Sequence, residues 1–264
     1  MMKGNKPIDR EGQSATVIFD NRSLATDYRT LRPLLQAGMN VLDIGCGTGA
    51  ISKDIANIVG EGGKVVGIDN TERFILSGRA TYQHVENLEL WHADLFSFES
   101  EEAFDLIVAA RVLQWLNNPV EALVKMKTLL KPNGKISILD YNHETLEWNP
   151  APPASMQVFY DTFLRWRSNA ALNNRIADDL AAMMQQAGLR DIQVTNSDEY
   201  YHRGRPDFKS KVGIWSHVAS SRQLVKEGYL DDALRLRAIQ EYDHWVEHEA
   251  VSMTMKLNEV RGSL

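Results

Sequence analysis

Hydrophobic positions follow two patterns along the chain, and their alternation predicts an α/β protein. Largely apolar runs at 41–44, 64–69 and 104–110 are typical of strands buried in a parallel sheet. Between such runs, apolar residues recur at helical spacing, as Ile51 and Ile55 do. Strands that alternate with helices in this way form sheets covered by helices on both faces.

Further stretches extend the expected sheet. Residues 88–94 and 135–140 read as strands, and 176–187 reads as a helix that leads to a strand at 191–196. Apolar residues recur again around 253–260, where we expect the final strand.

Three glycines mark the first turn of this pattern. Gly45, Gly47 and Gly49 directly follow the strand at 41–44, and a helix starts where they stop. Glycine permits a tight turn and lets a ligand approach bare backbone. The sequence therefore predicts a nucleotide-binding corner. The same glycines satisfy the dinucleotide pattern G-x-G-x-x-G/A, with Asp69 at a suitable distance downstream, so the glycines alone leave the nucleotide open.

Three further features favour one class of nucleotide. Asp43 stands inside the first strand, where a carboxylate would not help to hold a phosphate. Asp94 ends the third expected strand, and the turn Leu130–Gly134 precedes the fifth. With these features the chain resembles the class I S-adenosylmethionine-dependent methyltransferases of the small-molecule type, firmly over 32–141. The resemblance implies a Rossmann-like, doubly wound, seven-stranded sheet, mostly parallel with an antiparallel last strand, plus helical insertions.

The resemblance also implies roles for the acidic residues. Asp69 would accept hydrogen bonds from both ribose hydroxyls, although an Asp here could instead cap the next helix. Asp94 would accept from the adenine amino group beside the backbone N–H of Leu95, although a turn carboxylate is the alternative. The residues expected to bind S-adenosyl-L-methionine are Asp43, Gly45, Cys46, Gly47, Asp69, Asn70, Asp94, Leu95, Ala110 and Arg111.

The sequence pattern leaves the catalytic residues unknown. Methyl transfer from a sulfonium requires mainly that donor and acceptor be held in line, so no catalytic dyad is needed. Tyr141 and His143 follow the fifth strand and are the candidates nearest the ligand edge. Arg111 departs from the small or polar residue expected after the fourth strand; it could pair with a ligand carboxylate or with a neighbouring acid. Gln114-Trp115 is a short match to methyltransferases such as those acting on trans-aconitate.

An aromatic stripe follows the fifth strand. Phe159, Phe163 and Trp166 lie at i, i+4 and i+7 of an expected helix, a spacing typical of core packing. Methyltransferases often insert substrate-covering elements at this place, so we expect a substrate cap at 141–175.

The remaining length fits a single methyltransferase domain over 1–264. We expect a helical lid at 1–36, in which Tyr28 either covers the cofactor or packs the helix down, and a helical insertion at 200–249 before the last strand. Two alternatives remain for function: a non-catalytic S-adenosylmethionine-binding or regulatory protein, and an NAD-dependent oxidoreductase.

Composition limits the kinds of binding partner that we expect for this protein. The net charge of −6 argues against nucleic acid, which basic surfaces bind, and no apolar run is long enough to span a membrane. A lone cysteine, Cys46, excludes an intrachain disulfide, and no Cys/His cluster predicts a metal site. We expect a cytoplasmic protein with a small-molecule substrate. The acceptor atom and the oligomeric state do not follow from these residues.

Overall fold

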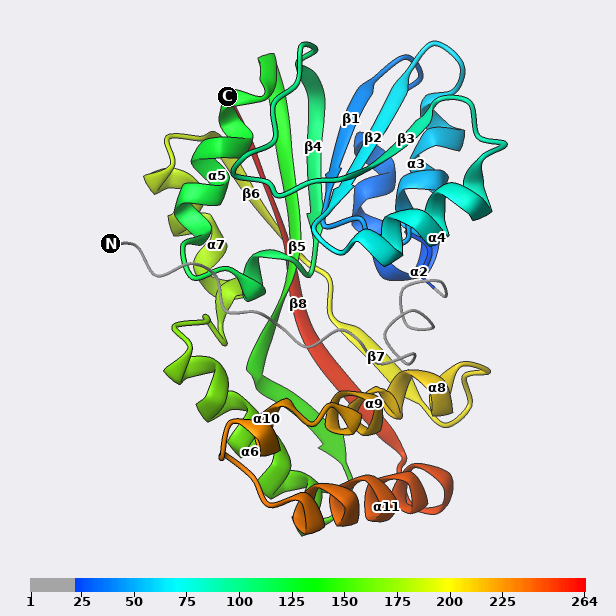
Figure 1. The fold of residues 1–264 in the computed structure, drawn as a ribbon, viewed down its shortest axis with the longest axis vertical. Helices are drawn as coiled ribbons and strands as arrows, with labels where there is room; N and C mark the ends of the chain where they lie inside the picture. Colours follow the sequence, from blue (N-terminus) through cyan, green and yellow to red (C-terminus); the bar gives the residue numbers. More distant parts are fainter. Residues whose placement is uncertain (1–21) are drawn as a thin grey trace.

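Eight strands form one sheet in the computed structural model, which describes residues 22–264 (Figure 1). The strand order is β3-β2-β1-β4-β5-β8-β6, and β7 pairs with β8 beside this path. Strands β1 to β5 run parallel, and β8 runs antiparallel to its neighbours. The strands are β1 (Asn40–Ile44), β2 (Lys64–Asp69), β3 (Leu88–His92), β4 (Phe104–Ala110), β5 (Leu130–Asn149), β6 (Arg190–Asn196), β7 (Glu199–His202) and β8 (Ser252–Ser263).

The predicted doubly wound sheet with an antiparallel last strand is therefore confirmed, but the predicted count of seven strands is wrong. The additional strand is β7, which continues along β8 beyond the end of β6. It occupies the start of the stretch expected to be a helical insertion at 200–249.

Helices cover both faces of this sheet. Successive residues of a strand point to opposite faces, so Val41 packs with α3 while Leu42 packs with α5 and α7. The helices of this Rossmann lobe are α2 (Leu24–Asp27), α3 (Ala50–Val59), α4 (Glu72–Tyr82), α5 (Pro119–Thr128) and α7 (Ile176–Gln186), with 3-10 helices η1 (Arg29–Leu34) and η2 (Leu113–Trp115).

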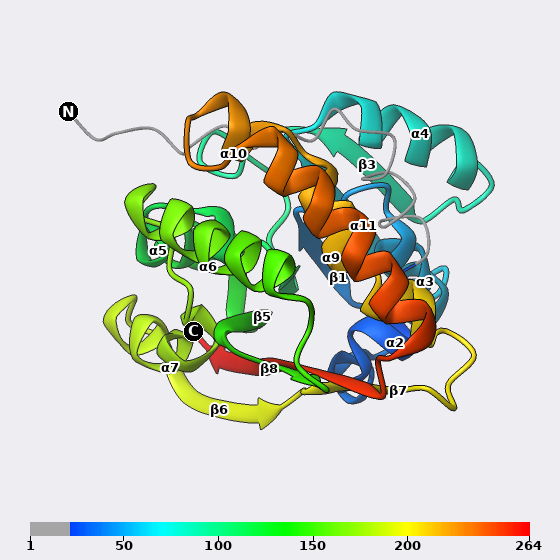
Figure 2. The ribbon, with the colours of Figure 1, turned by 90° about the horizontal axis from the view of Figure 1, so that it is seen from below.

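A helical lobe extends below the Rossmann lobe (Figures 1 and 2). Strands β5 and β8 reach into it as one antiparallel ribbon, which runs from the pair Lys135↔Ser263 to the pair Asn149↔Ser252. The register shifts between Asn142 and Glu147. Residues 141–149, predicted to begin the substrate cap, thus continue β5. The helices of this lobe are α6 (Ala154–Asn169), α8 (Phe208–Val212), α9 (Ile214–Ser220), α10 (Gln223–Lys226) and α11 (Asp232–His248).

The N-terminal part of the chain is described from residue 22. In the described part of the helical lid expected at 1–36, the chain forms the short α2 and then η1. Tyr28 is only 1% exposed, and its hydroxyl lies 2.8 Å from Ser137 Oγ. Tyr28 therefore packs this segment onto the sheet. A lid role for 1–36 stays a prediction, because residues 1–21 lie outside the described part of the chain.

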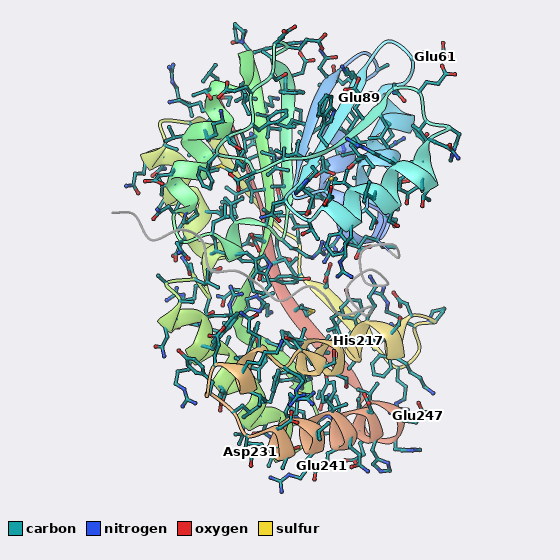
Figure 3. The ribbon with its side chains drawn as sticks, viewed as in Figure 1. Glu61, Glu89, His217, Asp231, Glu241 and Glu247 are labelled. Atoms are coloured by element: carbon teal, nitrogen blue, oxygen red, sulfur yellow. The ribbon has the colours of Figure 1, made fainter. Side chains whose placement is uncertain are left out.

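Acidic side chains are spread over both lobes. Figure 3 labels Glu61 and Glu89 on the Rossmann lobe and Asp231, Glu241 and Glu247 on the helical lobe. In residues 22–264, no group of three or more His, Cys, Asp or Glu side chains is arranged to hold a metal ion. None of the helices in this part of the chain is long and apolar enough to cross a membrane.

Candidate cofactor and acceptor site

The glycine corner joins β1 to α3 by a tight turn. Gly45, Gly47 and Gly49 all have positive φ angles, of 66°, 60° and 83°. A Cβ atom on Gly45 would lie 2.4 Å from Cγ2 of Val112, so the chain approaches the end of β4 closely here. The N–H of Gly45 donates to the carbonyl of Ile68 at 2.8 Å, which fixes the corner against β2. All three positions favour glycine for conformation, and Gly45 and Gly49 favour it for space as well.

Asp43 is a buried carboxylate beneath this corner. It is 4% exposed, and the hydroxyl of Ser52 donates to it at 2.6 Å. Burial raises the pKa of Asp43 to about 7, the Ser52 hydrogen bond opposes this rise, and the nearby charge of Asp69 adds to it. A cationic ligand group at this place would favour the charged form of Asp43.

Asp69 ends β2 and holds the corner together. One carboxylate oxygen accepts from the N–H of Gly47 at 3.0 Å, and the other accepts from the N–H of Thr71 at 2.8 Å. Thr71 itself is the cap residue of α4, so Asp69 is not the helix cap that the alternative interpretation proposed. An ionised carboxylate has about four acceptor positions, which leaves room for ligand hydroxyls.

Asp94 lies beyond the strand that was expected to end at it. Strand β3 ends at His92, because Asp94 forms a turn in which its carboxylate accepts from the N–H of Phe96 at 2.9 Å. The N–H of Ala93 donates to the carbonyl of Asp69 at 3.1 Å, which keeps this turn beside the end of β2. Asp94 is exposed and Leu95 is buried, and their role in adenine recognition stays a prediction.

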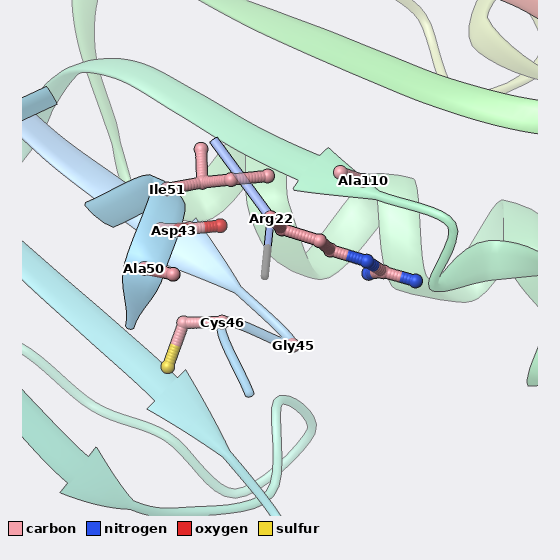
Figure 4. A pocket seen from close by; sticks show the side chains of 7 residues that line it. All are labelled: Arg22, Asp43, Gly45, Cys46, Ala50, Ile51 and Ala110. Carbon is pink, nitrogen blue, oxygen red and sulfur yellow. The ribbon is translucent and has the colours of Figure 1, made fainter. Parts of the chain in front are cut away.

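A narrow crevice lies in front of the glycine corner (Figure 4). In Figure 4 the side chain of Arg22 extends past Ala110 at the end of β4. The thiol of Cys46 lies on the other side of the corner, and burial raises its pKa well above the ordinary value. The lining residues are Arg22, Asp43, Gly45, Cys46, Ala50, Ile51 and Ala110. Four predicted residues thus meet in one crevice, and Gly47 and Asp69 are hydrogen-bonded to each other beside it.

Arg111 does not line this crevice with the others. Its φ angle is 62°, and its buried guanidinium donates to the hydroxyl of Tyr141 at 2.6 Å and to the carbonyl of Asp27 at 3.0 Å. It also forms an ion pair with Glu199 of β7. Of the two partners considered for Arg111, the described structure therefore contains the neighbouring acid.

Gln114 connects the end of β4 to β5. Its backbone N–H donates to the buried carboxylate of Asp140 at 3.0 Å, and its side-chain amide donates to the carbonyl of Arg111 at 3.2 Å. The amide oxygen then faces Nε2 of His143 at 2.6 Å. Nε2 of His143 is therefore the donor, and Nδ1 carries the free electron pair. Burial and the charge of Arg167 hold the pKa of His143 well below its ordinary value, so the ring is neutral.

Aromatic side chains from both lobes surround His143. Its ring centroid lies 5.2 Å from that of Tyr141, 6.0 Å from Phe163 of α6 and 6.2 Å from Trp215 of α9. Phe159, Phe163 and Trp166 are buried, in agreement with the core packing that their spacing predicted. Arg167, whose guanidinium lies over Trp115 at 4.7 Å, was not among the residues predicted from the sequence. Its position next to the aromatic stripe was the available signal.

The fold and the site together define a class I S-adenosylmethionine-dependent methyltransferase: a doubly wound sheet with an antiparallel β8, a glycine corner after β1, and a carboxylate at the end of β2. The family model described as "Methyltransferase domain" matches residues 35–204, and the chain belongs to this family. The interpretation as a methyltransferase is thereby confirmed, and nothing supports the oxidoreductase or the non-catalytic alternative.

Several curated relatives are demethylmenaquinone methyltransferases. The one from Bacillus cereus (strain B4264) is 28% identical over 204 residues, which cover 72% of this chain and 86% of the relative. The one from Staphylococcus aureus (strain JH9) is 27% identical over 172 residues, which cover 61% of this chain and 71% of the relative.

Solved structures share the fold. Phosphoethanolamine N-methyltransferase 2 of Haemonchus contortus, in complex with phosphomonomethylethanolamine and S-adenosylhomocysteine, is similar with a TM-score of 0.59. It is 14% identical, and the match covers 97% of this chain and 58% of that one. A putative sarcosine dimethylglycine methyltransferase from Galdieria sulphuraria gives a TM-score of 0.55 at 14% identity, covering 89% of this chain and 82% of that one.

The crevice residues fit the methyl donor of this family. S-adenosylmethionine combines positively charged groups with a ribose, and the crevice combines the buried Asp43 with the carboxylate of Asp69 at the end of β2. When bound, this cofactor supplies a methyl group on a positively charged sulfur. Asp43 would face its charge, Asp69 its ribose, and the backbone of Gly45 and Gly47 would allow close approach.

Proposed function

We propose that this protein transfers a methyl group from S-adenosylmethionine to a small organic molecule bound between the Rossmann lobe and the helical lobe. The observation that carries this proposal is the position of the Gln114–His143 pair. Gln114 donates to the carbonyl of Arg111, the residue next to Ala110 of the crevice. In open α/β sheets, ligands bind beyond the carboxyl ends of the strands. Gln114 follows the carboxyl end of β4, and His143 lies in the part of β5 that extends past its pairing with β4.

The surroundings of His143 favour a small acceptor. Side chains of β5, α6 and α9 enclose the ring, and a macromolecule could not reach a group buried among them. Such an enclosure would also exclude water from the transfer. The curated relatives, whose name specifies demethylmenaquinone, support an organic acceptor of modest size.

The neutral His143 has a limited part in the chemistry. A ring with so low a pKa holds a proton weakly, so His143 suits the orientation of a polar acceptor group through Nδ1 better than the storage of its proton. Gln114 fixes the ring in the tautomer that exposes this electron pair.

The test is transfer of an isotopically labelled methyl group from the donor into a metabolite extract. We expect label in the low-molecular-mass fraction, and label found only in protein or nucleic acid would refute the proposal. His143→Asn should lower kcat/KM for the labelled acceptor by about 10-fold, the scale of one lost hydrogen bond to the acceptor. His217→Asn is the matched control, because His217 lies exposed on α9. Wild-type kinetics of a folded His143→Asn variant would place the acceptor elsewhere.

A further inference from the structure

A buried guanidinium at the end of α6 has no acidic partner among residues 22–264. Arg167 is 0% exposed, and its Nε donates to Oδ1 of Asn174 at 2.7 Å. Nη2 donates to the carbonyls of Gln114 and Asn173, at 3.0 and 3.4 Å. All three acceptors are uncharged. Nη1 has no hydrogen-bond partner, and within the described chain no carboxylate oxygen lies within 4.0 Å of Arg167.

This arrangement differs from that of the other buried arginines. Arg111 is paired with Glu199 and Arg235 with Asp232, as expected because an unpaired buried charge is strongly unfavourable. The pKa of Arg167 is lowered to about 10 by burial, so the guanidinium is still charged at neutral pH. Asp140 attracts it from a distance, but the carboxylate of Asp140 already accepts two backbone N–H groups.

The neighbours of Arg167 form a surface suited to an organic molecule. The guanidinium lies 4.7 Å from the ring centroid of Trp115 and 5.5 Å from that of Phe163. Phe163 in turn contacts Trp215, whose buried indole N–H is a second donor without a partner in the described part of the chain. Two unsatisfied donors therefore border one aromatic cluster, beside His143.

We propose that the methyl acceptor is an oxyanion-bearing molecule whose carboxylate or phosphate binds Arg167 Nη1, with its apolar part against Phe163 and Trp215. The bond from Arg167 to the carbonyl of Gln114 ties this anion subsite to the acceptor position described above. This inference rests on the proposed function and names the substrate class for it. An acceptor anion would supply the charge that the protein itself does not.

The first experiment separates the acceptor by charge. A metabolite extract is passed over a strong anion exchanger at neutral pH, and the retained and unretained pools are each incubated with the wild-type protein and labelled donor. We expect label only in products of the retained pool. Phosphatase treatment of that pool beforehand distinguishes the two oxyanions, because it removes the activity of a phosphate monoester and leaves that of a carboxylate.

Label in products of the unretained pool would overturn the inference and leave the proposed function intact. No label from either pool would instead refute the proposed function, and the inference with it. These outcomes use only the wild-type chain and do not depend on how a variant folds.

The second experiment tests whether Arg167 binds the anionic group of the acceptor. Arg167→Gln should raise KM for the retained acceptor by about 10²-fold, the scale of a hydrogen bond between charged groups. Affinity for S-adenosylhomocysteine should stay within about twofold of wild type, since Arg167 is not among the crevice residues. Arg165→Gln is the matched control, because Arg165 is exposed on the same helix. An unchanged KM in folded Arg167→Gln would overturn the assignment, and Arg167→Lys should restore part of the affinity.

Discussion

The buried Asp43 should make the cofactor-free protein less stable as pH rises. Its pKa is about 7 in the folded chain against an ordinary value of 3.8, chiefly because burial disfavours the charged form. Between about pH 4 and pH 7, the folded protein therefore holds a proton that the unfolded chain has lost. Stability is fully present below this window and falls as pH rises through it.

The size of the change in stability follows from the shift in the pKa of Asp43. A difference of about three pH units corresponds to about 4 kcal/mol of unfolding free energy, at 1.36 kcal/mol for each unit. Asp43→Asn should abolish this share, because an amide of the same shape does not ionise. Ser52→Ala should extend the window at its upper end to higher pH, since the lost hydrogen bond favours the charged carboxylate of the folded protein.

The assay is urea unfolding without cofactor from pH 4.5 to 8.5, followed by far-ultraviolet circular dichroism. The difference in unfolding free energy between Asp43→Asn and wild type should grow in favour of the variant up to about pH 7 and then level off. Asp140, whose pKa burial also raises, to about 6, contributes equally to both proteins and cancels. A difference that does not change with pH would refute the reasoning.

Three other changes probe the corner and the buried ion pair. Gly45→Ala should lower thermal stability because its Cβ would meet Val112. Adding Val112→Ala should restore only part of the loss, since the positive φ angle of 66° at position 45 remains. Complete recovery of thermal stability in the double variant would contradict this. Asp69→Asn should weaken S-adenosylhomocysteine binding by about 1.5–3 kcal/mol in calorimetric titration, and unchanged affinity would exclude the ribose role. Glu199→Gln should cost about 3 kcal/mol or more in urea unfolding, because Arg111 is left buried and unpaired, and adding Arg111→Met should recover stability.

Much of the Rossmann lobe could be predicted because its central strands β1, β2 and β4 are largely apolar runs. Beyond Asp140, however, buried and exposed residues follow no simple alternation in β5, so the strand was interpreted there as the start of an insertion. Strand β7 has only four residues and forms because β8 offers it an edge. Pairing of that kind depends on residues about fifty positions away, which a local pattern does not contain.

The candidate site also contains residues that could be predicted from the sequence and residues that could not. Asp43 and the glycines could be predicted because neighbours in sequence build the corner. The partner of Arg111 could not, since Glu199 is 88 positions away. Arg167 was missed because a single arginine on an aromatic helix is typical of the exposed face. The roles assigned to 1–36, 141–175 and 200–249 stay predictions, as does the cytoplasmic location.

The position of β8 also determines when the sheet of this protein can be completed during synthesis. β8 lies between β5 and β6, yet it occupies Ser252–Ser263, so a ribosome makes both neighbours long before it makes the strand that joins them. Until then each neighbour exposes backbone groups that another chain could pair with. The sheet is therefore completed last, when β8 inserts between β5 and β6. A shortened chain without these twelve residues would keep the five-stranded sheet β3-β2-β1-β4-β5 with an open edge at β5, would leave β6 and β7 without a partner strand, and would be prone to aggregate.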